Sequence, residues 1–278
     1  MWRIIKKLLA EPLAIAGVVI IIFILLVAIF APFIATHDPQ STFPANRLQP
    51  PSRDNWMGTD NLGRDTFSRV VFGTRIALLV SLLAISFATL LGLTFGIISG
   101  FAGGKIDSAF LIFFDIIKSF PALLLAITII AITGPSLPML IIIIGITRFP
   151  AYSRLVRAQT LRVKGHDYIL AAKALGVSVP RIMIKHLLPN VLGPVFIQAA
   201  MDIPIVITFE AGLSFLGLGV PPPTPSWGSI LRTGYSFLRI APYMVIYGGA
   251  VLMLTTLGFT LMGETLRDFL DPKLRKVV

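Results

Sequence analysis

Long stretches without a charged side chain recur along this chain and are separated by shorter polar passages. An apolar stretch from Leu13 to Ala35 comes first, and charge-free runs then cover 76–104, 119–147, 213–231 and 240–263. The hydrocarbon core of a bilayer is about 30 Å thick and needs roughly 20 apolar residues per helix, whereas a soluble helix keeps a polar face. The pattern therefore predicts a membrane protein rather than a soluble helical domain.

We predict an all-α integral membrane protein with six transmembrane helices, because a helix satisfies its own backbone hydrogen bonds in hydrocarbon. The run 119–147 is divided between two spans, since the glycine and prolines of GPSLP (134–138) interrupt a helix. The first stretch has 23 residues, more than the roughly 7–15 of a signal-peptide core, and is expected to be retained. The predicted spans are 13–34, 75–99, 107–132, 138–156, 191–218 and 241–263.

The lysines and arginines fall unequally on the two sides of these spans. With the N-terminus inside, fifteen lie in cytoplasmic segments and seven in external ones. Because cytoplasmic loops carry the excess of basic residues, we predict that both termini are cytoplasmic and that the protein is a multi-pass protein of the cell (inner or plasma) membrane. The net charge of +11 is then a topology signal, and no nucleic-acid partner is expected.

The amino-acid composition argues against several kinds of chemical site in this chain. The chain is 55% hydrophobic and 13% charged, with a mean hydropathy of +0.87, whereas soluble domains carry about 25% charged residues. It has no cysteine, and its three histidines are not spaced as a metal-ligand pair. The nucleotide-binding pattern GxxxxGK(S/T) does not occur. We therefore expect no catalytic residue, no metal site and no cofactor held by this chain.

The longest predicted cytoplasmic loop, 157–190, begins with a helix that carries an apolar stripe. Tyr168, Ala172 and Leu175 recur at i, i+4 and i+7, and Gly176 suits a helix C-terminus. The sequence predicts a short helix followed by a turn.

A second helix of this loop is predicted to start at Ser178 as its N-cap, with Pro180 in the first turn, and to end at Pro189. It places Arg181 and Lys185 one turn apart. Two interpretations remain open on the residues alone: an interfacial helix whose basic side chains rest on anionic lipid, or a docking element for a cytosolic protein.

Five residues of this loop, Ala171, Ala172, Gly176, Leu188 and Pro189, resemble the coupling motif of ABC importer permeases. The resemblance implies a helix that fits a cleft on an ATPase subunit and transmits its movement to the spans. The residues that it assigns to this coupling, with the neighbouring charges, are Asp167, Ala171, Ala172, Gly176, Arg181, Lys185, Leu188 and Pro189.

The chain departs from this motif at Leu170, where the family carries a glutamate before the two alanines. Asp167 lies one turn earlier on the same helical face, and we expect it to take the place of that acidic group.

Three further segments resemble the C-type permease of the dipeptide/oligopeptide/nickel branch of this family. They are WMGTDNLGRDTFSRVVFGTR (56–75), LSFLGLGVPPPTPSWGSIL (213–231) and LRDFLDPKLR (266–275). The chain then divides into 1–74, with the first span and an external segment, and 75–278, a five-helix permease core with the coupling loop at about 157–190.

Within the first of these segments, Asp65 is expected to cap a short helix that ends at Gly73. Arg64, Arg69 and Arg75 would meet lipid phosphates, acidic neighbours or a docking protein, and an interfacial helix with snorkelling arginines is favoured. In the second segment, three consecutive prolines cannot continue a helix, and we expect a structural elbow, with a pore-lining or gate-shaping role as the alternative.

We expect Trp227, which follows this proline-rich elbow, at the membrane interface.

The resemblance implies the fold of a type I ABC importer permease and a set of partners. These are a homologous second permease forming a heterodimer, two ATPase subunits that bind ATP and Mg²⁺, an external substrate-binding protein, the lipid bilayer and a peptide substrate. The cargo implied is dipeptides or oligopeptides, with nickel chelates or oligosaccharides as the alternative.

Four ionisable residues are predicted inside spans, where charges are costly and face protein or water. Asp115 and Lys118 are three apart and are expected to pair. Asp202 and Glu210 are candidates for lining a translocation path, and interhelical hydrogen bonding is an equal alternative. Pro204 lies between them and would loosen the helix.

Two other functional classes are disfavoured. An ion-coupled transporter predicts inverted repeats with several mid-membrane acids, and an intramembrane enzyme needs a nucleophile–histidine, HExxH or paired-aspartate arrangement in its spans. Neither pattern is present.

Overall fold

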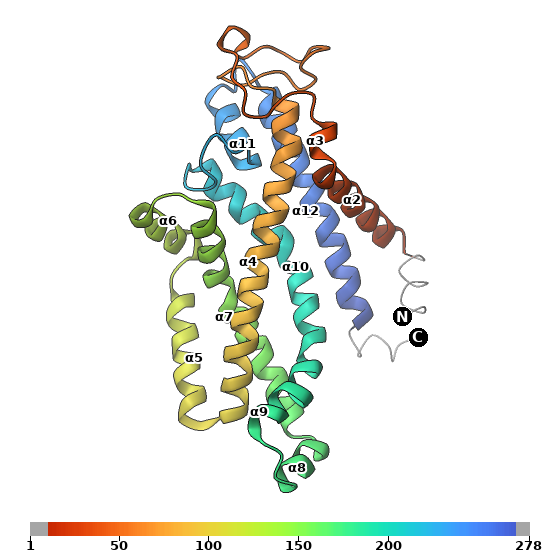
Figure 1. Cartoon of the computed structure of the whole chain (residues 1–278), viewed down its shortest axis with the longest axis vertical. Helices are drawn as coiled ribbons and strands as arrows, with labels where there is room; N and C mark the ends of the chain where they lie inside the picture. The colour runs from red at the N-terminus through yellow and green to blue at the C-terminus, as the bar shows by residue number, and fades with distance from the viewer. Residues whose placement is uncertain (1–10, 271–278) are drawn as a thin grey trace. The chain divides into compact units, whose positions relative to one another are not determined.

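The computed structural model describes residues 11–270, and side chains up to residue 268. The described part is almost entirely helical and contains no strand. Its α-helices are α2 (Pro12–Ile29), α3 (Ala31–Ile34), α4 (Thr66–Ala102), α5 (Gly104–Ser119), α6 (Ala122–Thr133), α7 (Leu137–Lys164), α8 (Asp167–Ala174), α9 (Val179–Ile182), α10 (Leu188–Phe215), α11 (Trp227–Ser236) and α12 (Tyr243–Leu270) (Figure 1). A 3-10 turn, η1, covers Pro44–Asn46, and a π-helical segment, η2, covers Met183–Leu187.

Part of the predicted orientation depends on residues outside this described part. They are Arg3, Lys6, Lys7, Lys273, Arg275 and Lys276. The end of the 266–275 segment lies outside it as well.

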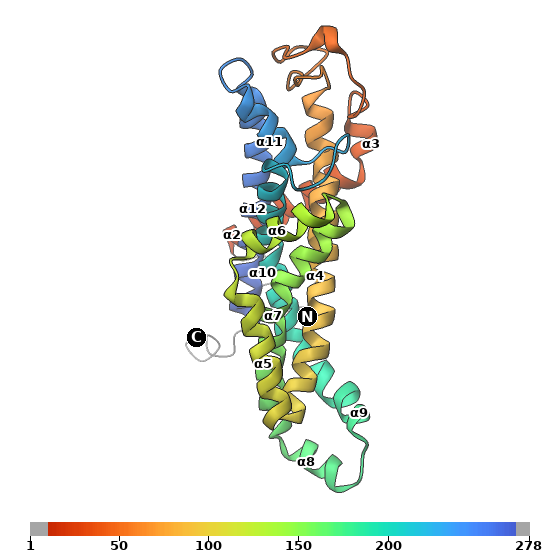
Figure 2. The same cartoon turned by 90° about the vertical axis from the view of Figure 1, so that its left-hand side faces the viewer.

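Five of the described helices are long and apolar enough to cross a membrane, and a sixth span results if the bent pair α5–α6 is counted as one. The third predicted span, 107–132, corresponds to α5 and α6, and these two helices are bent by 81° at their junction (Figure 2). Pro121 has no N–H to donate, and it keeps Phe120 extended at φ −86° and ψ 133°. A proline inside an otherwise uniform apolar run therefore breaks the helix.

The GPSLP turn is confirmed. Gly134 has φ +82°, a conformation that glycine adopts without a Cβ clash, and its N–H donates to Ile130 O at 2.8 Å. Ser136 then precedes α7, and its Oγ accepts from the N–H of Met139 at 3.3 Å.

The chain forms two compact units. Of the described residues, one unit contains 11–82, 127–141 and 201–270, and the other contains 83–126 and 142–200. The sequence-based division at residue 74 follows chain order and stays a prediction.

The core of the first unit surrounds Trp227, which is fully buried. Its indole Nε1 donates to Val70 O at 3.0 Å, and a Cβ built at Gly73 would lie 2.8 Å from its ring. The predicted interfacial position of Trp227 is therefore wrong, and so is a helix end at Gly73. Gly73 lies inside α4 because the indole needs the space that a side chain would take.

In the same unit α2 lies against α12, and glycines on both helices make the contact (Figure 1). A Cβ at Gly17 would lie 3.0 Å from Leu261 Cβ, and one at Gly258 would lie 2.5 Å from Ile20 Cγ2. Small residues let helix backbones approach closely in a membrane, which fixes the first span on the last one.

The second unit contains a glycine ridge, which we define as Gly92, Gly96 and Gly100 of α4. These residues repeat every four positions and so lie on one face of the helix. Built Cβ atoms at Gly92 and Gly96 would lie 2.3 Å from Tyr152 Cβ and 2.6 Å from Ser153 O of α7. A Cβ at Gly100 would lie 2.8 Å from Thr160 Cβ. The ridge therefore brings α4 and α7 into backbone contact.

Candidate functional site

The first helix of the predicted coupling loop is α8. Gly176 has φ +75°, its N–H donates to Lys173 O, and the N–H of Val177 donates to Ala172 O, both at 3.0 Å. This pair of bonds is the Schellman arrangement, in which a left-handed glycine ends a helix. The predicted role of Gly176 as the C-terminal glycine is confirmed.

The apolar stripe of α8 lies on the molecular surface. Tyr168 and Leu175 are exposed, Leu175 by 83%, and Ala172 is half-buried, whereas Ile169 is the residue of α8 that is fully buried. Ile169 packs the helix against the rest of the protein, and Tyr168 and Leu175 of the apolar stripe remain exposed on this chain.

The second helix of the loop does not end at Pro189, contrary to the prediction. α9 continues through η2 into α10, so that helical structure runs from Val179 to Phe215. Pro189 has no N–H for the α-helical bond to Lys185, and the preceding turns widen to the π form, with the N–H of Leu188 donating to Met183 O. The second arm of the predicted coupling loop is thus continuous with a candidate membrane span.

Ser178 occupies the predicted N-cap position with an extended backbone, but its side chain makes no capping hydrogen bond.

Most of the predicted coupling residues are exposed. This group comprises Asp167, Ala171, Gly176, Arg181, Lys185 and Pro189, whereas Ala172 and Leu188 are half-buried. Leu170, at the position of the family's glutamate, is 52% exposed. The surface combines an acidic N-terminus on α8 with basic side chains after the turn, as expected for docking on a charged protein cleft; their role stays a prediction.

Tyr168 joins α8 to the π segment. Its ring centroid lies 5.7 Å from that of His166 and 6.1 Å from that of His186, and Asn190 Nδ2 lies 3.4 Å from its hydroxyl. Asn190 also donates to His186 O at 2.6 Å. These contacts hold the two arms of the loop together across the turn; Figure 1 shows the backbone of α8 and α9.

Asp202 and Glu210, the candidate path residues, lie in α10 and are buried. They are eight residues apart, which is about 12 Å along a helix. Ser214 Oγ donates to Glu210 Oε1 at 2.6 Å and accepts from the N–H of Val220 at 3.2 Å. Neither carboxyl reaches the surface of this chain, and a lining role stays a prediction. Pro204 does not break α10, which is continuous through it.

Asp115 does not pair with Lys118 as expected. It forms an ion pair with Arg154 of α7. Arg157, one turn further along α7, binds Asp107 through Nε at 2.5 Å and Nη2 at 2.6 Å. The acids of α5 thus bind arginines of a neighbouring helix. The pair of Arg157 and Asp107 is bidentate, and such a guanidinium forms two charge-assisted hydrogen bonds with one carboxylate.

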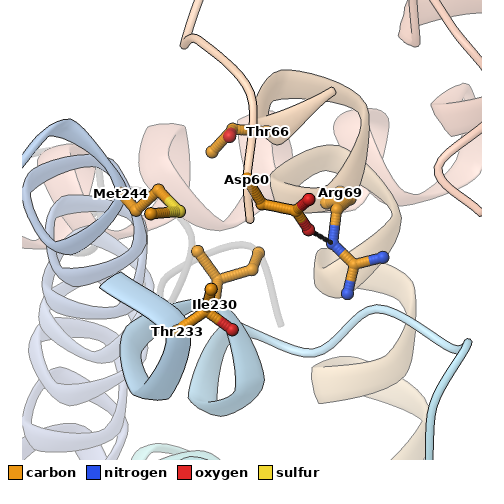
Figure 3. Close-up of a pocket in the computed structure, with 6 residues that line it drawn as sticks. All are labelled: Asp60, Thr66, Arg69, Ile230, Thr233 and Met244. Carbon is orange, nitrogen blue, oxygen red and sulfur yellow. Dashed lines mark ion pairs between the residues drawn. The ribbon is translucent and has the colours of Figure 1, made fainter. Parts of the chain in front are cut away.

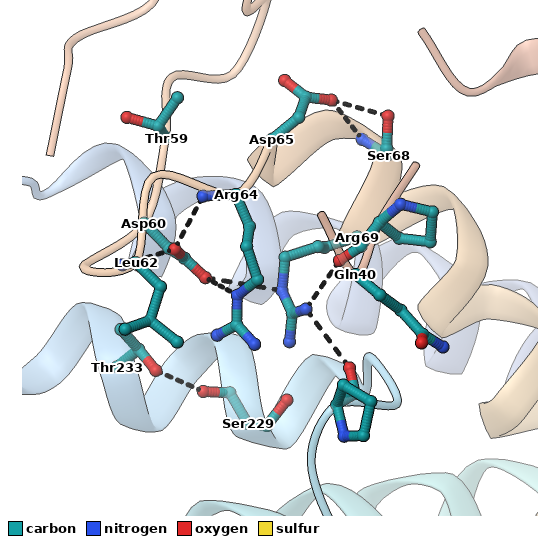
Figure 4. Close-up of polar contacts among 12 residues, drawn as sticks. Gln40, Thr59, Asp60, Leu62, Arg64, Asp65, Ser68, Arg69, Ser229 and Thr233 are labelled. Carbon is teal, nitrogen blue, oxygen red and sulfur yellow. Dashed lines mark hydrogen bonds and ion pairs between the residues drawn. The ribbon is translucent and has the colours of Figure 1, made fainter. Parts of the chain in front are cut away.

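A polar cluster, which we define as Asp60, Arg64, Asp65, Ser68 and Arg69, lies where the segment before α4 enters that helix. Asp60 accepts from Arg64 Nε at 2.7 Å and from the N–H of Arg64 at 3.0 Å, and its Oδ2 lies 3.6 Å from Arg69 Nε. Figure 4 shows dashed lines from its carboxylate to both arginine side chains, whose guanidinium groups lie side by side. Asp60, Arg64 and Arg69 are all buried, so the favoured interfacial position of these two arginines is wrong, and the alternative of an acidic neighbour is confirmed for both. Arg75, by contrast, is exposed.

Asp65 caps α4 as predicted. Its Oδ2 accepts from the N–H of Ser68 at 2.8 Å and from Ser68 Oγ at 2.7 Å, and its Oδ1 accepts from Asn55 Nδ2 at 2.9 Å. The helix is much longer than expected, since it continues to Ala102.

Arg69 extends the cluster to two further segments. Its Nη1 donates to Pro39 O at 2.9 Å and lies 3.5 Å from Pro223 O, in the proline-rich stretch before α11. Tyr243, at the start of α12, donates to Thr59 O at 2.8 Å. The proline-rich stretch is therefore an elbow that the contact between Arg69 and Pro223 O holds in place.

A cavity of about 10 Å³ adjoins the cluster, which is about the smallest volume that holds a water molecule. Asp60, Thr66 and Arg69 line one side, and Ile230, Thr233 and Met244 line the other (Figure 3). The Oγ1 atom of Thr66 is buried and has no hydrogen-bond partner in the described part of the chain.

A larger cavity, of about 150 Å³, lies in the segment before α4, and His37, Asp38 and Asn46 are among its lining residues. The N–H of Gln40 and the hydroxyl of Ser41 donate to Asp38 and hold the pKa of its carboxyl below the ordinary value.

The sequence interpretation missed Asp60. The signal was present, since Asp60 is followed by Asn61 and, two residues later, by Gly63, and aspartate, asparagine and glycine are turn-forming residues. Gly63 indeed has φ +72°.

In the described residues no group of three or more histidine, aspartate or glutamate side chains could hold a metal ion.

Comparison with known proteins gives consistent matches over the whole chain. Residues 92–276 match the family described as "Binding-protein-dependent transport system inner membrane component", and residues 1–51 match "N-terminal TM domain of oligopeptide transport permease C". The chain is 43% identical to the dipeptide transport system permease protein DppC of Alkalihalophilus pseudofirmus, over 99% of this chain and 90% of the relative. It is 39% identical to the oligopeptide transport system permease protein OppC of Bacillus subtilis, over 96% and 88%.

A solved structure shares the fold. The crystal structure of an amino acid ABC transporter with histidines superposes with a TM-score of 0.55 at 16% identity, over 76% of this chain and 95% of that chain. The predicted fold class, an all-α membrane permease of the type I importer kind, is confirmed. The chain therefore belongs to the family of binding-protein-dependent transport system inner membrane components, as a C-type permease subunit of the multi-pass kind.

Proposed function

We propose that this chain is one of two permease subunits of an ATP-driven importer and that its cargo is dipeptides or oligopeptides. The observation that carries the proposal is the 43% identity to a dipeptide permease across nearly the whole of both chains. The match of the N-terminal residues to the oligopeptide permease C description supports the same cargo class.

In this proposal the chain performs no chemistry. Two partner ATPase subunits bind ATP and Mg²⁺, an external binding protein delivers the peptide, and the homologous second permease completes the pathway. Asp167, Ala171, Ala172, Gly176, Arg181, Lys185, Leu188 and Pro189 form the ATPase-docking surface. The exposure of six of these eight residues and the continuity of this segment with α10 support the assignment, because a rigid helix that enters a span transmits a displacement to it.

The proposal also assigns Asp202 and Glu210 to the pathway, as carboxylates that become accessible when α10 moves between outward and inward states. Such a role requires Glu210→Gln to lower peptide uptake while ATP hydrolysis by the partners continues.

Reversing the charge at Asp167 is expected to weaken ATPase docking about tenfold, which corresponds to 1.4 kcal/mol. Asp167 is exposed in the first turn of α8, and Leu170 supplies no negative charge beside it. The measurement is the amount of ATPase that co-purifies with Asp167→Lys. Glu264→Lys, a reversal at an exposed acid of α12, is the matched control. Equal recovery of ATPase with both variants would contradict the role of Asp167.

The proposed function is tested by uptake. The permease, purified with its native partner subunits and reconstituted in liposomes with its binding protein, is expected to accumulate a radiolabelled dipeptide only when ATP is supplied. Accumulation of a nickel chelate or an oligosaccharide instead would contradict the assignment of peptides as the cargo. Uptake without ATP by this chain alone would contradict the ATP-driven mechanism.

A further inference from the structure

Phe101, near the C-terminal end of α4, contacts two lysines from other helices. Lys164 Nζ lies 5.4 Å from the ring centroid and donates to Phe101 O at 2.5 Å. Lys173 Nζ lies 4.7 Å from the same centroid. Both distances are within the range of about 6 Å for an attractive cation–π contact. We call these three residues the lysine–phenylalanine clamp.

The clamp connects the docking helix to the membrane helices. Lys173 lies in the last turn of α8, Lys164 is the last residue of α7, and only Gly165 and His166 separate α7 from α8. Phe101 follows directly after the glycine ridge, which brings α4 into backbone contact with α7. A displacement of α8 thus reaches α4 through side chains as well as α7 through the backbone.

The charges at the clamp explain why a ring is needed there. Two ammonium groups near one another repel, and the negative face of an aromatic ring attracts both. A leucine of similar size at position 101 would fill space without attracting Lys173, whereas Lys164 would keep its hydrogen bond to the backbone carbonyl. The aromatic character of Phe101, rather than its volume, therefore holds Lys173 in place.

We propose that Phe101 is a positioning residue for energy coupling: it holds α8 through Lys173 so that movement imposed on α8 by the ATPase reaches α4. This inference rests on the proposed function. It assigns the role to two residues, Phe101 and Lys173, that lie outside the docking surface, so their loss leaves ATPase binding intact and reduces the transport obtained per ATP hydrolysed.

A double-mutant cycle on the reconstituted complex tests this proposal. Phe101→Leu and Lys173→Met are each expected to lower the peptide imported per ATP about two- to fivefold, the range that a cation–π contact of this exposure allows. The double variant is expected to lose no more than either single variant, because both remove one interaction. Phe101→Trp and Lys173→Arg retain the ring and the cation and are expected to keep the wild-type ratio.

Lys105→Met is the control, since Lys105 is an exposed lysine at the same corner, in the first turn of α5. Additive losses in the double variant, or the same loss with Phe101→Trp as with Phe101→Leu, would overturn the clamp. The absence of ATP-dependent uptake by the wild-type complex would instead overturn the proposed function, so the two failures are distinguishable.

Discussion

Asp60→Asn is expected to destabilise the first unit by about 3–5 kcal/mol, the cost of breaking a buried ion pair by removing one partner. Arg64 and Arg69 remain buried after the substitution, and they lose the carboxylate that both contact. Asparagine keeps the shape of the aspartate side chain. The loss of stability therefore reports the removal of the negative charge and not the creation of a cavity.

The measurement is thermal unfolding of the purified chain in detergent. Asp54→Asn, at an exposed aspartate six residues earlier, is expected to change the stability by less than about 0.5 kcal/mol. An equal midpoint for the two variants would show that the polar cluster does not hold the segment before α4 onto the helices.

Gly92→Leu is expected to prevent stable packing of α4 on α7. The first carbon of any side chain at this position would lie 2.3 Å from Tyr152 Cβ and 3.1 Å from the Tyr152 carbonyl carbon, so the two backbones must separate. Gly92→Ala introduces that single carbon and is expected to cost about 1–3 kcal/mol, whereas leucine is expected to abolish accumulation of the folded chain in membranes.

Gly193→Ala is the matched control, since a Cβ at this helical glycine of α10 meets nothing within 4 Å. Alanine is the better helix former by about 1 kcal/mol, so this variant is expected to be neutral or stabilised. The measurements are the amount of each of the three variants in membranes and its thermal unfolding midpoint. A Gly92→Leu chain as stable as wild type would contradict the requirement for the glycine ridge in the packing of α4 on α7.

Local signals of the sequence predicted local structure well. The turn at Gly134, the cap at Asp65 and the helix end at Gly176 depend on backbone chemistry that a few neighbouring residues determine. The apolar runs predicted the spans, because hydrocarbon thickness fixes their length.

Features that depend on distant partners were not predicted. Arg69 was expected at the lipid interface because its partner Asp60 and its acceptor Pro223 O become apparent only in the fold. Trp227 was expected at the interface because tryptophan is common there, yet α4 offers it the carbonyl of Val70.

Two further features have signals in the sequence itself. The spacing of Gly92, Gly96 and Gly100 is a small-residue helix-packing pattern, and Pro121 interrupts the third span as Pro138 ends the turn before the fourth. Pro189, taken alone, predicts a helix end. A π segment accommodates it instead, because α10 continues beyond it.

Whether α8 binds an ATPase in the cell can be measured by cross-linking, since the chain has no native cysteine and Ala171 of α8 is exposed. A photoactivatable cross-linker on Ala171→Cys in intact cells is expected to form an adduct with an ATPase subunit, and the same reagent on Asp54→Cys is not. An adduct with phospholipid alone, or labelling of Ala171→Cys by a membrane-impermeant thiol reagent added outside the cell, would contradict the docking role of this loop.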